Sequence, residues 1–277
     1  MAKHNVAPIL KWAGGKRQLL SEIKNHLPKD YSTYYEPFFG GGAVLFTIQP
    51  RRAIISDINK DLILTYNVVK NNSTQLIESL KKHENTSEYF YELRDKDRDS
   101  SEYQNMSDVE KASRLIYLNK TCYNGLFRVN SLGHFNTPFA NYKNPNIVNE
   151  DMIKNVSAYF NQSVIKILNL DFERTVRNAQ KGDFIYFDPP YDPVSDTSSF
   201  TGYNQNGFSR SDQERLKKLC DKLNNKGVYF LLSNSATQFI KELYKDYEIS
   251  IVNAKRNVNS KGNGRGFVEE VLVRNYK

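Results

Sequence analysis

Hydrophobic positions follow two different periods along the chain. Short apolar runs bounded by Gly, Pro or Asp indicate buried strands, whereas longer stretches with apolar residues three or four positions apart indicate amphipathic helices. Strands and helices alternate near both ends of the chain, which is typical of an α/β fold with a doubly wound sheet. Seven strands are predicted, within residues 34–38, 52–57, 163–171, 184–187, 227–235, 247–254 and 267–276.

Helices are predicted between these strands and in a long insertion where the alternation stops. Their ranges are 16–26, 43–48, 61–82, 107–122, 211–225 and 236–247. Two helices begin at predicted capping boxes, in which a serine and an acidic residue three positions later each bond to the other's backbone N–H group. These boxes are Ser107 with Glu110, and Ser211 with Glu214.

Two β-hairpins are expected, one inside the insertion and one at the end of the chain. Residues 125–139 alternate in polarity around Ser131, Leu132 and Gly133, which indicates a hairpin with a three-residue turn. The last two strands flank the Gly-rich segment 260–266 and suit an antiparallel pair at the sheet edge. We expect one domain with a mixed seven-stranded sheet, residues 1–60 and 151–277, interrupted by a mostly helical insertion with a hairpin, residues 61–150.

Composition narrows the class of protein. A chain of 277 residues with 39% hydrophobic residues can bury a substantial core. No apolar stretch approaches the roughly 20 residues that span a bilayer, and the polar start lacks the apolar segment of a signal peptide. We therefore expect a cytoplasmic protein with no membrane partner. Two cysteines and four scattered histidines show no ligand spacing, so we expect neither a disulfide nor a metal.

The net charge of +8 favours a polyanionic partner, and its distribution suggests which surfaces would meet it. Residues 1–60 carry 9 Lys and Arg against 4 Asp and Glu, and residues 111–150 carry 5 against 1. Residues 255–277 are also basic. Residues 84–110 carry 3 against 9 and should point away from a phosphate backbone. The alternative is that each charged run is simply a solvated face.

A glycine-rich turn follows the first strand. Gly40, Gly41 and Gly42 would let the backbone approach a ligand, and Asp57 at the end of the second strand could hold ribose hydroxyls. This is the general plan of a nucleoside-cofactor site. The spacing lacks the G-x-G-x-x-G form, which argues against a nicotinamide dinucleotide. A tight turn without a ligand is the alternative.

The segment from Asp188 to Tyr191 follows a buried strand, at the sheet edge where ligands gather. An exocyclic amine conjugated to an aromatic ring is a poor nucleophile. Two acceptors on its N–H bonds, the Asp188 carboxylate and the Pro189 carbonyl, would free its lone pair for an electrophile. Pro190 would fix the direction of that carbonyl, and Tyr191 offers a face for a base. These four are the candidate catalytic residues; the alternative is an acid that begins a Pro-Pro turn.

The chain contains, in this order, LKWAGGKRQLL, YYEPFFGGGAVLF, AIISDINKDLI, CYNGLFRVNSLGHFNTPF and YFDPPYDP. Over nearly its whole length it resembles the Dam-type DNA adenine methyltransferases. The resemblance implies a Rossmann-like methyltransferase sheet, S-adenosylmethionine as methyl donor, and a flipped-out adenine in duplex DNA as acceptor. It implies that residues 1–60 and 151–277 bind the cofactor and that residues 61–150 recognise the DNA target.

The resemblance also assigns contacts to individual residues. Cofactor contacts are assigned to Trp12, Lys16, Phe39, Gly40, Asp57, Asp171, Phe172 and Asp188. The alternative for Trp12 is a packed aromatic side chain, and for Lys16 a charge at a helix start.

DNA contacts are assigned to Tyr123, Asn124, Leu126, Arg128 and Pro138. Arg128 is the residue type that makes bidentate bonds to guanine, and Pro138 matches a contact to a thymine methyl group. The first three resemble residues that fill the gap left by a flipped base. Where the family commonly has an arginine before the tyrosine, this chain has Asn141 before Tyr142, which should weaken affinity and salt dependence more than base choice.

We therefore expect an adenine-specific DNA methyltransferase that acts at GATC and is paired with a restriction endonuclease. Residues 193–210 are predicted to form a lid over the flipped base, the alternative being a loop without a role. A methyltransferase for RNA or protein glutamine is one alternative, which Arg128 and the aspartate at 188 oppose. A sequence-specific regulator without activity is another, which the intact Lys16, Asp57 and Asp188 oppose.

Overall fold

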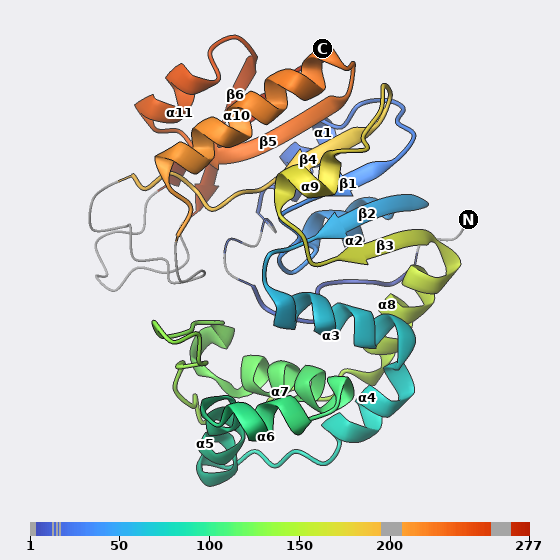
Figure 1. The fold of residues 1–277 in the computed structure, drawn as a ribbon, viewed down its shortest axis with the longest axis vertical. Helices are drawn as coiled ribbons and strands as arrows, with labels where there is room; N and C mark the ends of the chain where they lie inside the picture. Colours follow the sequence, from blue (N-terminus) through green and yellow to red (C-terminus); the bar gives the residue numbers. More distant parts are fainter. Residues whose placement is uncertain (1–3, 13, 15, 17, 195–206, 256–266) are drawn as a thin grey trace.

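The computed structural model describes residues 4–12, 14, 16, 18–194, 207–255 and 267–277, without the side chains of 254, 255, 267 and 268. Most of the predicted lid and the Gly-rich turn of the last hairpin lie outside the described residues. Within them, the chain forms a twisted sheet with helices on both faces. The insertion lies outside one of these two helical layers, on the side away from the sheet (Figure 1).

A mixed seven-stranded sheet forms the centre of the fold, which confirms the predicted fold class. The strand order is β3-β2-β1-β4-β5-β7-β6. The first five strands in this order run parallel, and β7 is antiparallel to both neighbours. The order reverses between β1 and β4, and ligands bind at such a switch point in open α/β sheets. The strands are β1 (Tyr34–Glu36), β2 (Arg52–Ser56), β3 (Val164–Leu168), β4 (Phe184–Phe187), β5 (Tyr229–Ser235), β6 (Glu248–Lys255) and β7 (Phe267–Arg274).

Two hydrophobic cores cover the two faces of the sheet. Helices α1 (Leu20–Asn25), α2 (Ala43–Ile48), α3 (Lys60–Asn71) and α8 (Glu150–Gln162) pack on one face. Helices α9 (Phe172–Val176), α10 (Arg210–Asn225) and α11 (Gln238–Leu243) pack on the other. All four residues of β4 are buried, as its continuous apolar run predicts for a strand covered on both sides.

The insertion is a helical cluster built around α7 (Asp108–Thr121), which contacts α3, α4 (Ser73–Leu80) and α5 (Ser87–Asp95). Its remaining helices are η1 (Lys96–Arg98), α6 (Ser100–Asn105) and η2 (Tyr123–Gly125). The predicted hairpin follows α7 and is held by an isolated bridge between Val129 and Phe135. Its turn closes where the Asn130 N–H group donates to the His134 carbonyl at 2.9 Å.

Several local predictions need correction. The single helix predicted over 61–82 is two helices, because Asn72 leaves the helical region with φ −133° and ψ 34°. The second capping box is Ser209 with Asp212, two residues before the predicted one. Both pairs have the same spacing, so the local pattern could not separate them. The capping box at Ser107 is confirmed. Helix α1 begins at Leu20, and α11 is shorter at both ends than predicted.

Candidate active site

Asp188 lies at the carboxyl end of β4, next to the switch point. Its Oδ1 atom accepts a hydrogen bond from Ser233 Oγ at 3.0 Å and forms an ion pair with Lys16 Nζ at 2.9 Å. Both partners are buried, and 18% of the Asp188 side chain is exposed. Burial raises the pKa of Asp188, although the bonds from Lys16 and Ser233 oppose this shift by favouring the ionised form.

The backbone after Asp188 is held by buried amide side chains. The Asp192 N–H group donates to Asn234 Oδ1 at 3.0 Å, and Asn234 Nδ2 donates to Gln213 Oε1 at 3.1 Å. Gln213 Nε2 then donates to the Pro190 carbonyl at 2.9 Å. Asn234 on β5 and Gln213 on α10 are at most 1% exposed, so this chain of bonds is shielded from water. It fixes the path of the turn that follows the acid.

The Tyr191 ring lies near Asp188. Its hydroxyl donates to Glu270 Oε2 on β7 at 2.7 Å, and the ammonium of Lys16 lies 4.5 Å from its ring centroid. Among the described residues, none donates a hydrogen bond to the Pro189 carbonyl oxygen. Asp188 and Pro189 therefore place a carboxylate and a carbonyl oxygen on successive residues, and their role in holding an amino group stays a prediction.

The glycine turn and Asp57 are joined by direct contacts. The Gly40 N–H group donates to Asp57 Oδ2 at 2.9 Å, and the Asn59 N–H group donates to Asp57 Oδ1 at 2.9 Å. Gly40 has a φ of +49°, and a Cβ atom there would lie 3.1 Å from Cδ1 of Trp12. Glycine at this position therefore allows the tryptophan ring to lie against the turn.

The other predicted cofactor residues lie in two different surroundings. Phe39 is 2% exposed and packs edge-on against Tyr66 in the core. Asp171 caps α9 and forms an ion pair with Arg215 NH2 at 2.6 Å, while Phe172 stacks on the ring of Phe38 at a centroid distance of 5.3 Å. The partly buried Phe38, next to the predicted Phe39, thus lies with the 171–172 segment.

Sequence reasoning missed Glu36, the last residue of β1. This side chain is 2% exposed, and its Oε2 atom accepts bonds from the Tyr34 hydroxyl at 2.8 Å and the Leu45 N–H group at 3.1 Å. Burial raises the pKa of Glu36 to about 8, and the nearby charge of Asp188 adds to this shift. A glutamate directly before Pro37 was the available signal, because proline cannot continue a central strand.

The predicted DNA-contacting residues all lie in the segment that follows α7 and contains the hairpin. Tyr123 is 58% exposed and its N–H group donates to the Pro138 carbonyl at 2.9 Å. Asn124, with φ +56°, is exposed and donates its N–H group to the Tyr142 hydroxyl at 3.1 Å. The exposed Arg128 is held by Asn136, whose Oδ1 atom accepts from its Nε atom at 2.7 Å. Leu126 lies half-buried between them in the sequence.

The amino-terminal segment links this hairpin to the glycine turn. The Trp12 ring stacks on Phe127 with centroids 4.8 Å apart and an interplanar angle of 21°. Asn119 on α7 accepts from the Lys11 N–H group at 2.9 Å and donates to the Lys11 carbonyl at 2.8 Å and to the Gly125 carbonyl at 3.0 Å. One short segment therefore contacts both halves of the predicted site.

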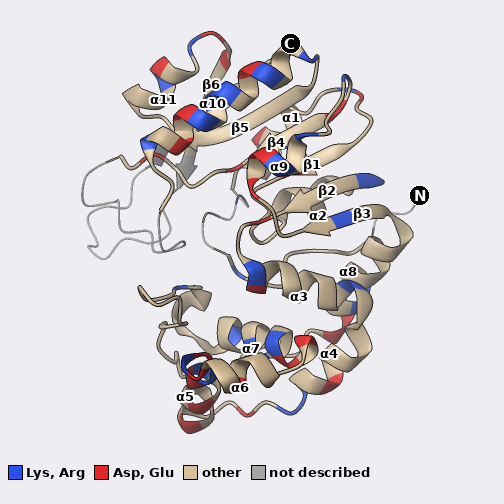
Figure 2. Cartoon of the chain, in the orientation of Figure 1, with Lys and Arg blue, Asp and Glu red and all other residues tan. Residues whose placement is uncertain are grey.

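The acidic segment forms α5, η1 and α6 at the end of the insertion that lies far from the sheet (Figure 2). One of its acids turns inward. Asp97 Oδ2 accepts from the Phe135 N–H group at 2.8 Å and pairs with Arg114 NH2 at 2.9 Å. Asp97 therefore links the hairpin to α7 through these two contacts.

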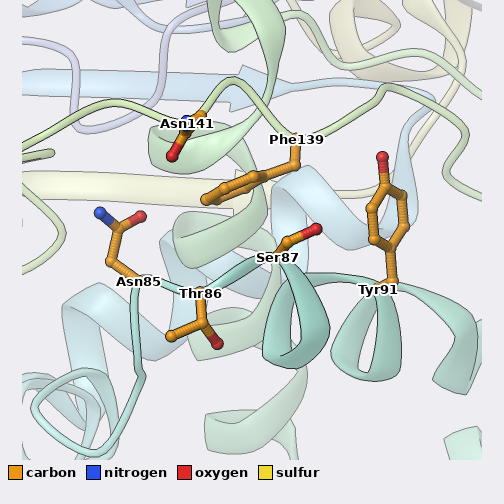
Figure 3. A pocket seen from close by; sticks show the side chains of 6 residues that line it. All are labelled: Asn85, Thr86, Ser87, Tyr91, Phe139 and Asn141. Carbon is orange, nitrogen blue, oxygen red and sulfur yellow. The ribbon is translucent and has the colours of Figure 1, made fainter.

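Asn141, where the resemblance led us to expect arginine, has a left-handed backbone with φ +52°. Asparagine adopts this conformation more readily than most residues. Its side chain lines a hollow at the start of α5, together with Asn85, Thr86, Ser87, Tyr91 and Phe139 (Figure 3). The backbone conformation gives a physical reason for the asparagine, and its effect on affinity stays a prediction.

In the part of the chain that the structure describes, no three His, Cys, Asp or Glu side chains are placed to hold a metal ion. Over the same residues, every helix is too short or too polar to cross a membrane.

Comparison with known proteins identifies the family. A family model for D12 class N6 adenine-specific DNA methyltransferases matches residues 12–258. The chain is 47% identical to the type II methyltransferase M1.LlaDCHI of Lactococcus lactis subsp. cremoris, over 99% of this chain and 97% of that protein. It is 44% identical to M.MjaIII of Methanocaldococcus jannaschii, over 98% and 99%. A DNA adenine methylase of Escherichia coli (strain K12) is 33% identical over 95% and 93%. The chain therefore belongs to the D12 class N6 adenine-specific DNA methyltransferases.

Proposed function

We propose that this enzyme transfers a methyl group from S-adenosylmethionine to the exocyclic amino group of adenine in duplex DNA, at the sequence GATC. The observation that carries the proposal is the pair of acceptors at the switch point. Asp188 Oδ1 is engaged by Lys16 and Ser233. Among the described residues, none donates to Asp188 Oδ2 or to the Pro189 carbonyl, so these are the acceptors proposed for the two hydrogens of an amino group.

Those two acceptors activate the amine. When both N–H bonds are held, the nitrogen lone pair leaves conjugation with the purine ring and points toward the electrophile. Pro190, whose own carbonyl is held by Gln213, keeps the turn in place during this step. The base stacks on Tyr191.

The cofactor site is built from the glycine turn and its neighbours. S-adenosylmethionine supplies the electrophilic methyl group when it is bound. Gly40 and Trp12 offer a backbone and an aromatic surface to the nucleoside. Each Asp57 oxygen accepts one backbone N–H group and retains a lone pair for a ribose hydroxyl. The remaining proposed contacts are Lys16, Phe39, Asp171, Phe172 and Asp188.

The insertion, residues 61–150, is the proposed target-recognition domain. Arg128 reads guanine in the major groove. Its Nε and NH2 atoms donate to the side-chain and backbone oxygens of Asn136, which leaves NH1 and the second hydrogen of NH2 as donors for the base. Tyr123, Asn124 and Leu126 fill the space left by the flipped adenine, and Pro138 contacts a thymine methyl group. The exposed positions of Tyr123, Asn124, Arg128 and Pro138 support this assignment.

Two relatives carry the name type II methyltransferase. On that basis we infer that this enzyme works in the cytoplasm beside a restriction endonuclease and protects the sites which that endonuclease cleaves. A strain that carries the endonuclease without this enzyme should suffer cleavage of its own DNA.

A direct test incubates the enzyme and an Asp188→Ala variant with the methyl donor and plasmid DNA, and maps modified adenines by sequencing. The proposal expects methylation at GATC by the unaltered enzyme and almost none by the variant. Methylation at another sequence would overturn the proposed recognition sequence, GATC. Methyl uptake into RNA or protein with none in duplex DNA would overturn the substrate.

A further inference from the structure

Ser233 is placed beside Asp188 by the register of two central strands. Strands β4 and β5 are parallel, with Phe187 paired to Leu232, so the next residue of each strand reaches the same edge of the sheet. Ser233 is completely buried. A buried hydroxyl requires hydrogen-bond partners, because leaving it unpaired costs about 1–3 kcal/mol. From the sequence, Ser233 was expected only as a residue of its strand.

The hydrogen bonds of Ser233 are directional: its hydroxyl accepts from Tyr186 and donates to Asp188. Its single proton can go to Asp188 Oδ1 at 3.0 Å or to the Phe187 carbonyl at 3.5 Å. The shorter contact to a charged acceptor is the stronger one. Ser233 Oγ also lies 2.9 Å from the hydroxyl of Tyr186, which must then be the donor in that contact. The result is a chain from Tyr186 through Ser233 to Asp188.

The Tyr186 hydroxyl stays protonated in this series of hydrogen bonds. The tyrosine is completely buried, and burial together with the charge of Asp188 raises its pKa well above its ordinary value. Tyr186 therefore keeps its proton around neutral pH and can remain the donor. This polarises the serine hydroxyl toward the carboxylate.

We propose that Ser233 is a positioning residue for methyl transfer, which together with Lys16 holds Asp188 Oδ1 so that Oδ2 is left to accept a hydrogen bond from the target amine. The inference rests on the proposed function and deepens it. It explains why one oxygen of Asp188 receives both donors from the described part of the chain. A carboxylate free to rotate would offer the amine a mixture of orientations, and small errors in orientation are costly in catalysis.

Three variants test the role of Ser233. Ser233→Ala removes the donor, Ser233→Cys keeps a weak donor of similar shape, and Tyr186→Phe breaks the chain one step earlier. The rate of methyl transfer in a single turnover should fall roughly tenfold to a hundredfold in Ser233→Ala, less in Ser233→Cys and least in Tyr186→Phe. Duplex affinity and donor affinity should stay close to those of the unaltered enzyme, because Ser233 acts through Asp188 and no ligand contact is assigned to it.

The pH profile separates positioning from a structural role. The groups that surround Asp188 are Lys16, Glu36, Tyr186, Tyr191 and Glu270. All five remain in Ser233→Ala, and only the donor to Asp188 is lost. The acid limb of the single-turnover rate should therefore move to higher pH, because loss of a bond to the ionised form raises the pKa of Asp188.

Ser113→Ala is the matched control. Ser113 is also completely buried, and its hydroxyl bonds to His83 Nε2 at 2.8 Å in the insertion, away from Asp188. Ser113→Ala should leave the rate of methyl transfer and its pH profile unchanged. Melting curves should show that all variants are folded.

An unchanged rate in Ser233→Ala, or a slower rate with an unmoved acid limb and no recovery in Ser233→Cys, would overturn the positioning role. If the unaltered enzyme methylated no duplex DNA, the proposed function itself would fail instead.

Discussion

Glu36→Gln should change how stability depends on pH. Glu36 is buried against the Tyr34 hydroxyl and the Leu45 N–H group, and its pKa in the folded chain is about 8 against an ordinary value of 4.5. Between these two values the folded chain holds a proton that the unfolded chain has released. The free energy of unfolding must therefore fall as pH rises through this window.

The magnitude follows from the shift. A difference of about 3.5 pH units, from 4.5 to about 8, corresponds to about 5 kcal/mol at 1.36 kcal/mol per unit. Glutamine has nearly the same shape, can accept both existing hydrogen bonds and does not ionise. Glu36→Gln should therefore lose this part of the pH dependence and, at pH 8, be more stable than the unaltered enzyme.

Urea unfolding at a series of pH values from 5 to 9, followed by circular dichroism, measures the effect. Glu78→Gln removes the same formal charge from a side chain that is 62% exposed, and controls for the change in net charge. If Glu36→Gln and the unaltered enzyme lost stability with the same slope between pH 5 and pH 8, Glu36 would not be the buried, protonated acid described above.

Three further substitutions test the site and the fold. Asp188→Asn should slow methyl transfer on the order of a thousandfold, because the charged acceptor is lost, with little change in duplex affinity measured by gel shift. Arg128→Lys should reduce discrimination for guanine roughly tenfold to a hundredfold, measured by competition between duplexes, since lysine cannot make the bidentate contact. Gly42→Ala should destabilise the fold by about 1–3 kcal/mol in urea unfolding. Gly42 has φ +73°, and an added Cβ atom would lie 2.4 Å from Cζ of Phe39.

Strands and turns of the sheet could be predicted because each carries a local signal. The run from Phe184 to Phe187 stops at an acid and two prolines, and the structure ends β4 at Phe187. The glycine turn and the helix that begins at Ala43 were predicted for the same reason. Such signals depend on backbone chemistry within a few residues.

Contacts between distant segments could not be predicted in this way. Lys16 and Ser233 meet Asp188 across separations of 172 and 45 residues. The register of β4 and β5 brings Ser233 to this position, and the folded path of the amino-terminal segment brings Lys16 there. From the sequence, Glu36 is an ordinary residue within the strand predicted over 34–38, and its burial is known only from the structure. Helix α8 was not predicted at all, and Asn72 interrupts what reads as one amphipathic helix because its side chain and backbone favour a non-helical conformation.

The most direct test of the central claim is a crystal structure of the enzyme with an unreactive analogue of the methyl donor and a GATC duplex. The account predicts the target adenine outside the helix, with its amino group within hydrogen-bonding distance of Asp188 Oδ2 and the Pro189 carbonyl. An adenine that remained stacked, or an amino group held by other residues and not by Asp188 and the Pro189 carbonyl, would contradict it.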